Sequence, residues 1–333
     1  MPESLEKKRA LVTGADGFIG SHLVEQLVRN GASVRAFSHY NSWNNIGWLA
    51  DADPKLIRDV EIFRGDVRDA ERVRQAVHGC DYVFHLSSLI GIPYSYDAPR
   101  SYVETNVTGA LNVLEACRHS DSLIRLVHTS TSEVYGTAQT VPISETHPLV
   151  GQSPYSATKI AADKLAESFH LSFKLPVATA RPFNTYGPRQ TARAVIPTIA
   201  SQLLAGGDSL KLGSLTTTRD FNYVLDTVTG MMALALSHEA EGRAINIGTG
   251  REWSIEHTAR LLMEITGRKI PIVCEDERIR PTGSEVSRLI ADTTLIKSLT
   301  GWTPQTDFRE GLEQTVKWIE RNLGLFNPMH YSV

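Results

Sequence analysis

The stretch Thr13-Gly14-Ala15-Asp16-Gly17-Phe18-Ile19-Gly20 decides the fold. It places three glycines at intervals of three residues, after the apolar run 10–12 and before apolar residues at helical spacing. Glycines at these positions allow a tight turn, close approach of the backbone to a pyrophosphate, and close packing of the helix. The helix N-terminus then offers free N–H groups and a partial positive charge to an anion. The stretch therefore predicts a dinucleotide-binding turn between a strand and a helix.

Strand and helix patterns alternate through the first half of the chain. Short apolar stretches predict strands at 34–37, 60–63, 82–86, 123–128 and 177–180. Longer stretches, at 105–117 and 153–173, have the spacing of helices. Strands separated by helices of this length imply βαβ crossovers and a parallel sheet covered on both faces. The sequence thus predicts an α/β fold, a Rossmann-type doubly wound parallel sheet with a smaller C-terminal lobe.

The pattern loosens after Pro182, where glycine and proline interrupt it more often. We expect residues 1–182 to form the dinucleotide-binding domain. Residues 183–333 should form mainly a substrate-binding lobe, interleaved with the first. Within that half, 220–250 should return to the main sheet, because 244–247 has the apolar character of a buried strand.

Composition and charge exclude several classes of protein. The 333 residues are long enough for one large domain or two, and 41% hydrophobic with 21% charged residues is typical of a globular chain. A net charge of −3 without a basic stripe argues against nucleic acid or a membrane surface as partner. No apolar run approaches about 18 residues, so no membrane helix is expected. The three scattered cysteines argue against a disulfide framework or a metal site, and with no signal-peptide pattern we expect a cytoplasmic protein.

The residue after the second predicted strand bears on the choice of cofactor. An acidic residue there commonly binds the ribose 2′-hydroxyl of NAD, but this chain has Ser38 followed by His39. The missing carboxylate removes the usual barrier to the 2′-phosphate of NADP. No arginine follows to bind that phosphate, although Arg35 lies within the strand. These residues leave NAD and NADP open, with NAD slightly preferred. Asp66, after the third strand, is placed either to contact the adenine amino group or to cap its loop.

Acid–base candidates follow the fifth predicted strand and open the helix 153–173. Tyr155 and Lys159 lie one turn apart, so they face the same way. An ammonium beside a phenol lowers the phenol's pKa from about 10, which suits Tyr155 to take a proton from a hydroxyl while hydride leaves the same carbon. Thr131 lies at the carboxyl edge of the sheet and is placed to hydrogen-bond the same oxygen. A glutamate at the end of a buried strand is costly unless useful, so Glu133 is a candidate for a second acid or base.

With these residues identified, the chain resembles the extended short-chain dehydrogenase/reductases of the NAD-dependent epimerase/dehydratase family, which act on nucleotide sugars. The resemblance covers 8–321 and rests on the glycine-rich stretch, His85-Leu86-Ser87-Ser88, Tyr155 with Lys159, the stretch 181–189, and Arg219-Asp220-Phe221. The triplet Thr131-Ser132-Glu133 matches a form found in 4,6-dehydratases, whereas 4-epimerases usually have a small residue at position 133. The stretches 89–96, 187–198 and 280–286 are most similar to the NAD-dependent 4,6-dehydratases of legionaminic acid biosynthesis.

The resemblance implies a nucleotide-sugar 4,6-dehydratase acting on a UDP- or GDP-N-acetylglucosamine-type substrate. The sugar would be oxidised at C4, lose water across C5 and C6, and regain the hydride at C6, giving a 4-keto-6-deoxy sugar nucleotide. A tightly bound NAD or NADP would be regenerated in each turnover. UDP-glucuronate decarboxylases carry the same Thr-Ser-Glu-Val-Tyr-Gly run, so a decarboxylase or a 4-epimerase on this scaffold is the alternative. A non-catalytic nucleotide-binding regulator is disfavoured, because the acid–base residues are intact.

The resemblance also assigns site residues. The catalytic set is Thr131, Ser132, Glu133, Tyr155 and Lys159, in which relatives have an aspartate at the position of Ser132, so the proton for the leaving water comes from Glu133 or Ser132. The cofactor set is Gly14, Asp16, Gly17, Phe18, Ile19, Gly20, Ser38, Asp66, Val67, Leu86, Ser87, Ser88, Asn106, Thr129, Tyr155, Lys159 and Pro182. The substrate set is Ile92, Asn184, Arg193, Val195, Arg219 and Arg280. By analogy, the helices near 99–118 and 153–173 would pair across a twofold axis in a homodimer.

Overall fold

A parallel β-sheet forms the centre of the larger of two parts in the structure, a computed structural model that describes residues 4–278, 283 and 285–328. Within these residues the strands of this sheet follow the order β11-β6-β5-β4-β1-β2-β3, and every neighbouring pair is parallel. Their bounds are β1 (Arg9–Thr13), β2 (Ser33–His39), β3 (Glu61–Gly65), β4 (Tyr82–His85), β5 (Arg125–Thr129), β6 (Val177–Pro182) and β11 (Ala244–Ile247). The predicted Rossmann-type doubly wound fold is confirmed.

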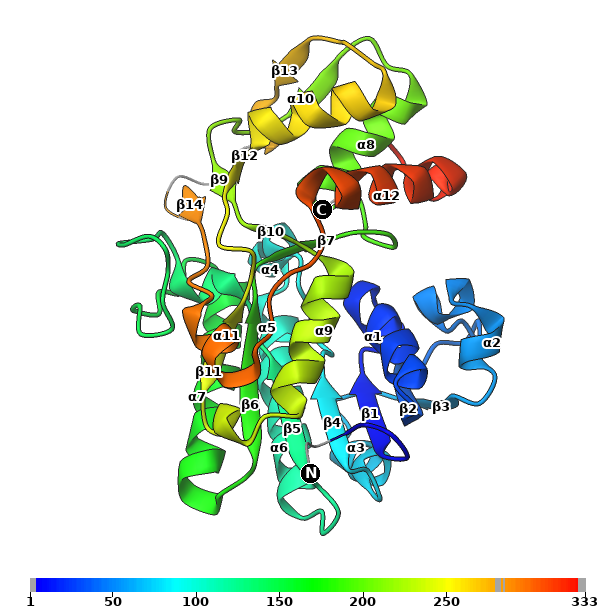
Figure 1. Cartoon of the computed structure of the whole chain (residues 1–333), viewed down its shortest axis with the longest axis vertical. Helices are drawn as coiled ribbons and strands as arrows, with labels where there is room; N and C mark the ends of the chain where they lie inside the picture. Colours follow the sequence, from blue (N-terminus) through cyan, green and yellow to red (C-terminus); the bar gives the residue numbers. More distant parts are fainter. Residues whose placement is uncertain (1–3, 279–282, 284, 329–333) are drawn as a thin grey trace.

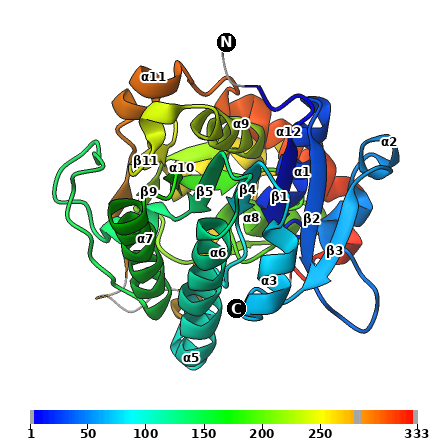
Figure 2. The same ribbon diagram turned by 90° about the horizontal axis from the view of Figure 1, so that it is seen from below.

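Helices cover both faces of the sheet, as Figure 2 shows from below. One face carries α1 (Phe18–Arg29), α9 (Val224–Ala235) and α11 (Thr294–Thr300). The other carries α3 (Ala70–Val77), α6 (Gly109–Arg118) and α7 (Pro154–Phe173). The apolar side chains of each face form a separate buried cluster with the strands. Burial on both faces explains why the strand sequences are continuously apolar rather than alternating between apolar and polar residues.

Helix α7 illustrates how local sequence positions the site. Its N-terminus is a capping box, in which Ser153 Oγ accepts from the N–H of Ser156 at 3.1 Å and Ser156 Oγ accepts from the N–H of Ser153 at 3.0 Å. Pro154 occupies the first helical position, where the missing N–H costs nothing. The helix therefore begins at a defined residue, and Tyr155 lies in its first turn.

The smaller part lies above the sheet in Figure 1. It contains α8 (Val195–Ala205), α10 (Ile255–Thr266) and α12 (Phe308–Arg321), with the short strands β8 (Leu210–Leu212), β9 (Thr218–Arg219), β12 (Trp253–Ser254), β13 (Ile272–Cys274) and β14 (Arg288–Leu289). A third apolar cluster joins its helices. Strands β7 (Asn184–Tyr186) and β10 (Phe221–Tyr223) pair with each other where the chain passes between the two parts.

The remaining elements are short. They are α2 (Pro54–Ile57), α4 (Ile92–Asp97), α5 (Pro99–Tyr102), η1 (Gly47–Asp51), η2 (Val103–Thr108), η3 (Ser132–Tyr135), η4 (His238–Ala240), η5 (Asp276–Arg278) and η7 (Leu323–Leu325). Helices α5 and α6 are joined by the π-helical turn η2 without a break in helical backbone. No described helix combines the length and the apolar character needed to cross a membrane.

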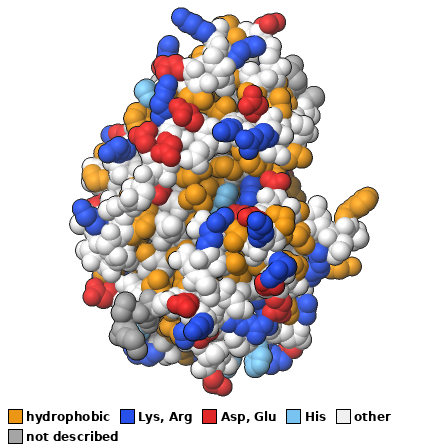
Figure 3. All heavy atoms as spheres, turned by 45° about the vertical axis from the view of Figure 1, so that its right-hand side comes forward, with side chains coloured by type: hydrophobic (Ala, Val, Ile, Leu, Met, Phe, Trp, Pro, Cys, Tyr) orange, Lys and Arg blue, Asp and Glu red, His pale blue; other side chains and the backbone are white. Residues whose placement is uncertain are grey.

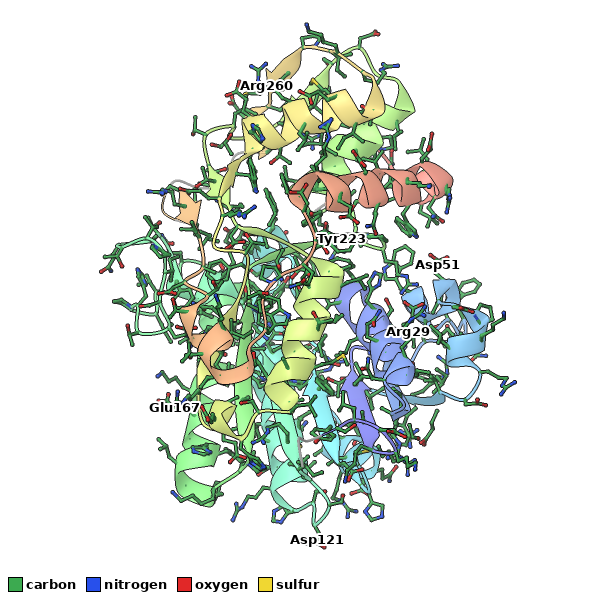
Figure 4. The ribbon with its side chains drawn as sticks, in the orientation of Figure 1. Arg29, Asp51, Asp121, Glu167, Tyr223 and Arg260 are labelled. Atoms are coloured by element: carbon green, nitrogen blue, oxygen red, sulfur yellow. The ribbon has the colours of Figure 1, made fainter. Side chains whose placement is uncertain are left out.

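Polar contacts fasten the two parts together. Arg189 donates hydrogen bonds to the carboxylate of Glu25 on α1 through Nη1, at 3.0 Å, and through Nη2, at 3.2 Å. Asp51, at the end of η1, accepts from the indole N–H of Trp318 on α12 at 3.3 Å. Tyr223 lies at the junction of the two parts (Figure 4), where its hydroxyl donates to Gln314 Oε1 at 2.8 Å. These contacts hold the smaller part over the carboxyl edge of the sheet.

Candidate active site

A cleft of about 1010 Å³ runs between the carboxyl edge of the sheet and the smaller part. The glycine-rich turn, η3, the start of α7, the segment 86–94, and the segments 182–196 and 212–221 all contribute to its lining. In the space-filling view, hydrophobic side chains and Lys or Arg side chains gather at mid-height between the upper and lower parts (Figure 3). Ligands of open α/β sheets bind outside this edge, so the cleft is the candidate active site.

The glycine-rich turn has the geometry of an anion cradle. Gly14 has φ +69°, a left-handed conformation, and a Cβ at Gly20 would collide with the carbonyl oxygen of Gly14. The N-cap of α1 is Gly17, and no side chain caps this helix. The first N–H groups of α1 are therefore left for a ligand at the positive end of the helix dipole. A dinucleotide pyrophosphate fits this arrangement.

Tyr155 and Lys159 both line the cleft and are 7% and 5% exposed. Lys159 Nζ donates to the carbonyl oxygen of Thr129 at 2.6 Å. Burial lowers the pKa of Lys159 to about 8, and the charge of Asp163 opposes the shift. Burial also raises the pKa of Tyr155 above its ordinary value, while a hydrogen bond with Thr131 opposes this. This direction differs from the expected lowering by lysine, because desolvation of the phenolate is the larger effect.

The triplet after β5 forms the start of the 3-10 helix η3, beside Tyr155. Thr131 caps η3, and its Oγ1 accepts from the N–H of Glu133 at 3.2 Å. Ser132 is buried, Glu133 is half-buried, and both line the cleft. The negative charge of Glu133 is near enough to contribute to the raised pKa of Tyr155. Two oxygen acids thus share one wall of the cleft, an arrangement suited to proton transfer at two positions of one substrate.

A buried polar network lies behind this wall, and the sequence analysis did not predict it. The rings of His85 and His128 stack at 5.6 Å, and His128 Nε2 lies 3.4 Å from Asp163 Oδ1. Asp163 Oδ2 accepts from Arg181 Nη2 at 3.0 Å. Burial lowers the pKa of both histidines, which keeps them neutral. The one available signal was the position of Asp163, one helical turn after Lys159.

Most of the predicted site residues come together in the cleft. Its lining includes Gly14, Asp16, Gly17, Phe18, Ile19, Gly20, Asp66, Val67, Leu86, Ser87, Ser88, Ile92, Thr129, Thr131, Ser132, Glu133, Tyr155, Lys159, Pro182, Asn184, Arg193, Val195 and Arg219. Arg280 lies outside the described residues.

Two predicted cofactor residues do not line the cleft. Ser38 on β2 is fully buried, because its side chain belongs to the interior side of the strand, and its Oγ has no hydrogen-bond partner among the described residues. Asn106 is also buried and instead holds the segment at the cleft. Its Oδ1 accepts from the N–H of Leu89 at 2.8 Å, and its Nδ2 donates to the Leu89 carbonyl at 3.0 Å. Asn106 therefore supports the wall rather than forming it.

Several lining residues were missed by the sequence analysis. They include His39, Trp48, Tyr94, Arg278 and Glu285, which come from segments far apart in the chain. Glu285 Oε1 lies 3.3 Å from Arg219 Nη2, so the described cleft contains an ion pair at a position predicted to bind phosphate. Usable hints were the place of Tyr94 and Glu285 within the stretches 89–96 and 280–286, and the position of Arg278 near the predicted Arg280.

Comparison with known proteins identifies the family. The model of the GDP-mannose 4,6-dehydratase family matches residues 11–315. This chain belongs to the GDP-mannose 4,6-dehydratase family. The resemblance to NAD-dependent epimerases and dehydratases is thereby confirmed at the level of the family. Its members act on nucleotide sugars as dehydratases, decarboxylases or epimerases.

Relatives of this GDP-mannose 4,6-dehydratase family member carry different activities. A UDP-N-acetyl-alpha-D-glucosaminuronate decarboxylase of Bacillus cytotoxicus is 32% identical, over 94% of this chain and 98% of its own. The structure of a dTDP-glucose 4,6-dehydratase from Streptomyces venezuelae with NAD superposes with a TM-score of 0.84, at 29% identity over 97% of this chain and 100% of that chain. A UDP-glucuronic acid 4-epimerase from Bacillus cereus with UDP-glucuronic acid and NAD gives 0.84, at 28% identity over 94% and 99%.

Proposed function

We propose that this protein is an NAD-dependent nucleotide-sugar 4,6-dehydratase, with a UDP- or GDP-N-acetylglucosamine-type substrate. The observation that carries the proposal is the half-buried Glu133 beside Tyr155 in the cleft. Oxidation at C4 requires one base, and elimination across C5 and C6 requires a second acid or base close by. An epimerase needs only the first of these groups.

NAD is the proposed cofactor. The glycine cradle and the uncapped N-terminus of α1 fit its pyrophosphate, and the structures of the dehydratase and the epimerase compared above contain NAD. A bound nicotinamide would supply the acceptor for the C4 hydride and would return that hydride to C6, while C5 regains a proton. Residues 1–182 are proposed to hold the cofactor, and residues 183–333 mainly the substrate.

The chain's own residues account for the proton transfers. Tyr155 takes the proton from the sugar O4. Thr131 forms a hydrogen bond with the same oxygen. Lys159 places a positive charge behind the phenol and stabilises the phenolate as it forms. The resulting 4-keto group acidifies the C5 proton, which passes to Glu133. As the C5–C6 double bond forms, the C6–O bond breaks, and the leaving hydroxyl takes a proton from Glu133 or Ser132 and departs as water.

Substrate binding is proposed to use the segments above the sheet. Arg219, on β9, and Arg193, in the loop before α8, are placed to form charge-assisted hydrogen bonds with the diphosphate. Asn184 begins β7 at the same edge. A diphosphate needs only a few placed cations and a helix N-terminus, so an acidic chain of net charge −3 is compatible with this substrate.

A homodimer is part of the proposal. Helices α5 to α6 and α7 lie side by side and carry the exposed apolar residues Val103, Leu171 and Phe173. Pairing of these helices with those of a second copy would remove apolar surface from water. Size-exclusion chromatography with light scattering tests this part of the proposal independently of activity.

A decarboxylase is the second candidate, because of the similarity to a glucosaminuronate decarboxylase. Incubation with UDP- and GDP-N-acetylglucosamine, with UDP-glucuronate and UDP-N-acetylglucosaminuronate in parallel, followed by mass spectrometry, separates the candidates. Loss of one water from an N-acetylglucosamine nucleotide supports the proposal. Loss of carbon dioxide from the uronate would establish the decarboxylase instead. An unchanged mass with a new sugar epimer would establish a 4-epimerase.

The role of Glu133 is tested with Glu133→Gln, which keeps the shape of the side chain and removes its basicity. We expect turnover to fall by about 10²- to 10⁴-fold, the usual contribution of a general acid or base. Substrate-dependent reduction of the nicotinamide should persist, because oxidation at C4 does not use Glu133. The matched control is Glu239→Gln, an exposed glutamate outside the lining of the cleft. Dehydration at the wild-type rate in Glu133→Gln would contradict the mechanism.

A further inference from the structure

The carboxylate of Asp16 lies at the end of β2, although Asp16 belongs to the glycine-rich turn. Its Oδ2 accepts a hydrogen bond from the N–H of His39, the last residue of β2, at 3.1 Å. The N–H of Ala15 donates to the carbonyl of Phe37 at 3.3 Å, so turn and strand end are joined at two points. Asp16 is half-buried and lines the cleft.

This position matters because the end of the second strand faces the adenosine ribose in dinucleotide-binding folds. An acidic residue there hydrogen-bonds the ribose 2′-hydroxyl of NAD. In this chain the strand itself supplies only Ser38, which is fully buried. We propose that Asp16 supplies the missing carboxylate from the turn and makes the cofactor site selective for NAD over NADP. The proposal deepens the proposed NAD-dependent function and rests on it.

The surroundings of Asp16 hold it in place. The N–H of Trp48 donates to the carbonyl oxygen of Asp16 at 2.9 Å, and a Cβ at Gly47 would collide with that oxygen. The indole of Trp48 packs edge-on against Trp318 of α12, with ring centroids 5.4 Å apart. The backbone of Asp16 is thus enclosed by segments from both parts of the molecule. A carboxylate fixed in this way loses little conformational entropy when it binds a hydroxyl.

The nearby arginines already have partners. Arg35 is buried and directed to Glu61, at 2.9 Å, and to backbone carbonyls of the α3 region. Arg64 donates to the carbonyls of residues 44 and 45, at 3.0 Å each. Arg68 binds Asp66 through two nitrogens. Arg35 and Arg68 are thus paired with carboxylates, whereas Arg64 is held by backbone carbonyls and its charge also acts on Asp16.

The two cofactors would therefore meet opposite electrostatic conditions at this point. The 2′-hydroxyl of NAD would donate a charge-assisted hydrogen bond to Asp16. The 2′-phosphate of NADP would bring its negative charges against a half-buried carboxylate, where screening by water is weak. His39 is the one titratable side chain of the β2 end that lines the described cleft, and it is exposed.

The test measures cofactor binding and needs no turnover. The full-length protein, stripped of cofactor, is titrated in a calorimeter with NAD, with NADP, and with NAD lacking the adenosine 2′-hydroxyl. We expect the wild type to bind NAD at least about tenfold more tightly than either of the other two, as the loss of a hydrogen bond to a charged group predicts. Asp16→Asn should lower the ratio of NAD to NADP affinity by at least about tenfold. Asp16→Ala should also abolish the penalty for the missing hydroxyl.

The matched control is Asp59→Asn, because Asp59 is an exposed aspartate paired with Arg58 away from the cleft. Its NAD to NADP ratio should equal that of the wild type. Cofactor-induced shifts of the melting temperature provide a second readout for a variant that binds weakly. Equal wild-type affinity for NAD and NADP, or an unchanged ratio in Asp16→Asn, would overturn the inference alone. Failure of the wild type to bind either dinucleotide would overturn the proposed function with it.

Discussion

The ammonium of Lys159 donates to the backbone carbonyl oxygen of Thr129, at 2.6 Å, and this bond joins helix α7 to the end of strand β5. Both residues are buried, so the carbonyl compensates a charge that has lost its water. Thr129 is followed within two residues by Thr131, which hydrogen-bonds Tyr155. The contact therefore sets the helix that carries Tyr155 against the loop that carries Glu133.

Turnover should depend on pH through Lys159. Burial lowers the pKa of this ammonium to about 8. It is protonated below that value and neutral above it, so activity should be level well below pH 8 and decline as the pH rises through it. A plot of kcat against pH for the proposed dehydration reaction measures this decline, the alkaline limb of the pH profile. A level profile well above pH 8 would contradict the proposed role of the ammonium.

Asp163→Asn should move the alkaline limb of the kcat profile to lower pH. The charge of Asp163 raises the pKa of Lys159, so its removal lets the pKa fall further. The control is Glu167→Gln on the same helix, an exposed residue paired with Lys164 (Figure 4). Circular dichroism checks that Asp163→Asn still folds, because Arg181 loses its carboxylate partner. Asp163→Glu should restore the limb, which a purely structural defect would not predict.

Tyr155→Phe should strongly reduce turnover while leaving ligand binding intact. Removal of the hydroxyl deletes the proposed base for O4, and we expect a loss of about 10²- to 10⁴-fold in kcat. Affinity for NAD should change little, because the ring still fills its buried position against Tyr102. Tyr96→Phe, outside the lining of the cleft, is the comparison variant. Comparable kcat values for the two variants would rule out Tyr155 as the base.

Glu285→Gln should tighten the binding of UDP or GDP. Glu285 Oε1 lies 3.3 Å from Arg219 Nη2, so this carboxylate competes with a diphosphate for the guanidinium. Because the pair is partly exposed, we expect a modest gain of about two- to fivefold in affinity, measured by calorimetry. Glu264→Gln removes an exposed carboxylate from the Arg309 pair and should leave affinity unchanged. Weaker nucleotide binding in Glu285→Gln would show that Glu285 supports the site instead.

Glu25→Gln should destabilise the junction of the two parts. Arg189 and Glu25 form a two-point ion pair with side chains only 8% and 12% exposed. Removing one charge leaves a buried guanidinium uncompensated, which costs about 3–5 kcal/mol. Urea denaturation measures this loss. Glu256→Gln, on the surface pair with Arg260 (Figure 4), should change stability by less than about 0.5 kcal/mol, and equal effects of the two would contradict the assignment.

Local pattern was sufficient for the fold, whereas most of the residues that line the cleft were assigned through the resemblance to nucleotide-sugar enzymes. Residues 13–20 require a strand, a turn and a helix in that order, because glycine conformation and helical periodicity act over a few residues. The parallel sheet followed from strands separated by helices. Since the carboxyl ends of parallel strands meet at one edge, Thr131, Glu133 and Tyr155 were expected to meet there, and they do line the same cleft.

Contacts between segments that are distant in the sequence could not be predicted from local pattern. The interior direction of Ser38, the supporting role of Asn106 and the pairing of Arg219 with Glu285 depend on how loops pack, and no local rule encodes them. The direction of the shift in the pKa of Tyr155 depends on its burial, which follows from the whole packed wall.

The sequence by itself determined the order of strands and helices, the glycine cradle and the residue types at the edge of the sheet, because each depends on short-range geometry. Tertiary structure alone decided where charge is buried and which partner meets it. Asp16 illustrates the difference: its place in the turn is visible in the sequence, but its carboxylate reaches the end of β2 only when turn and strand are packed together.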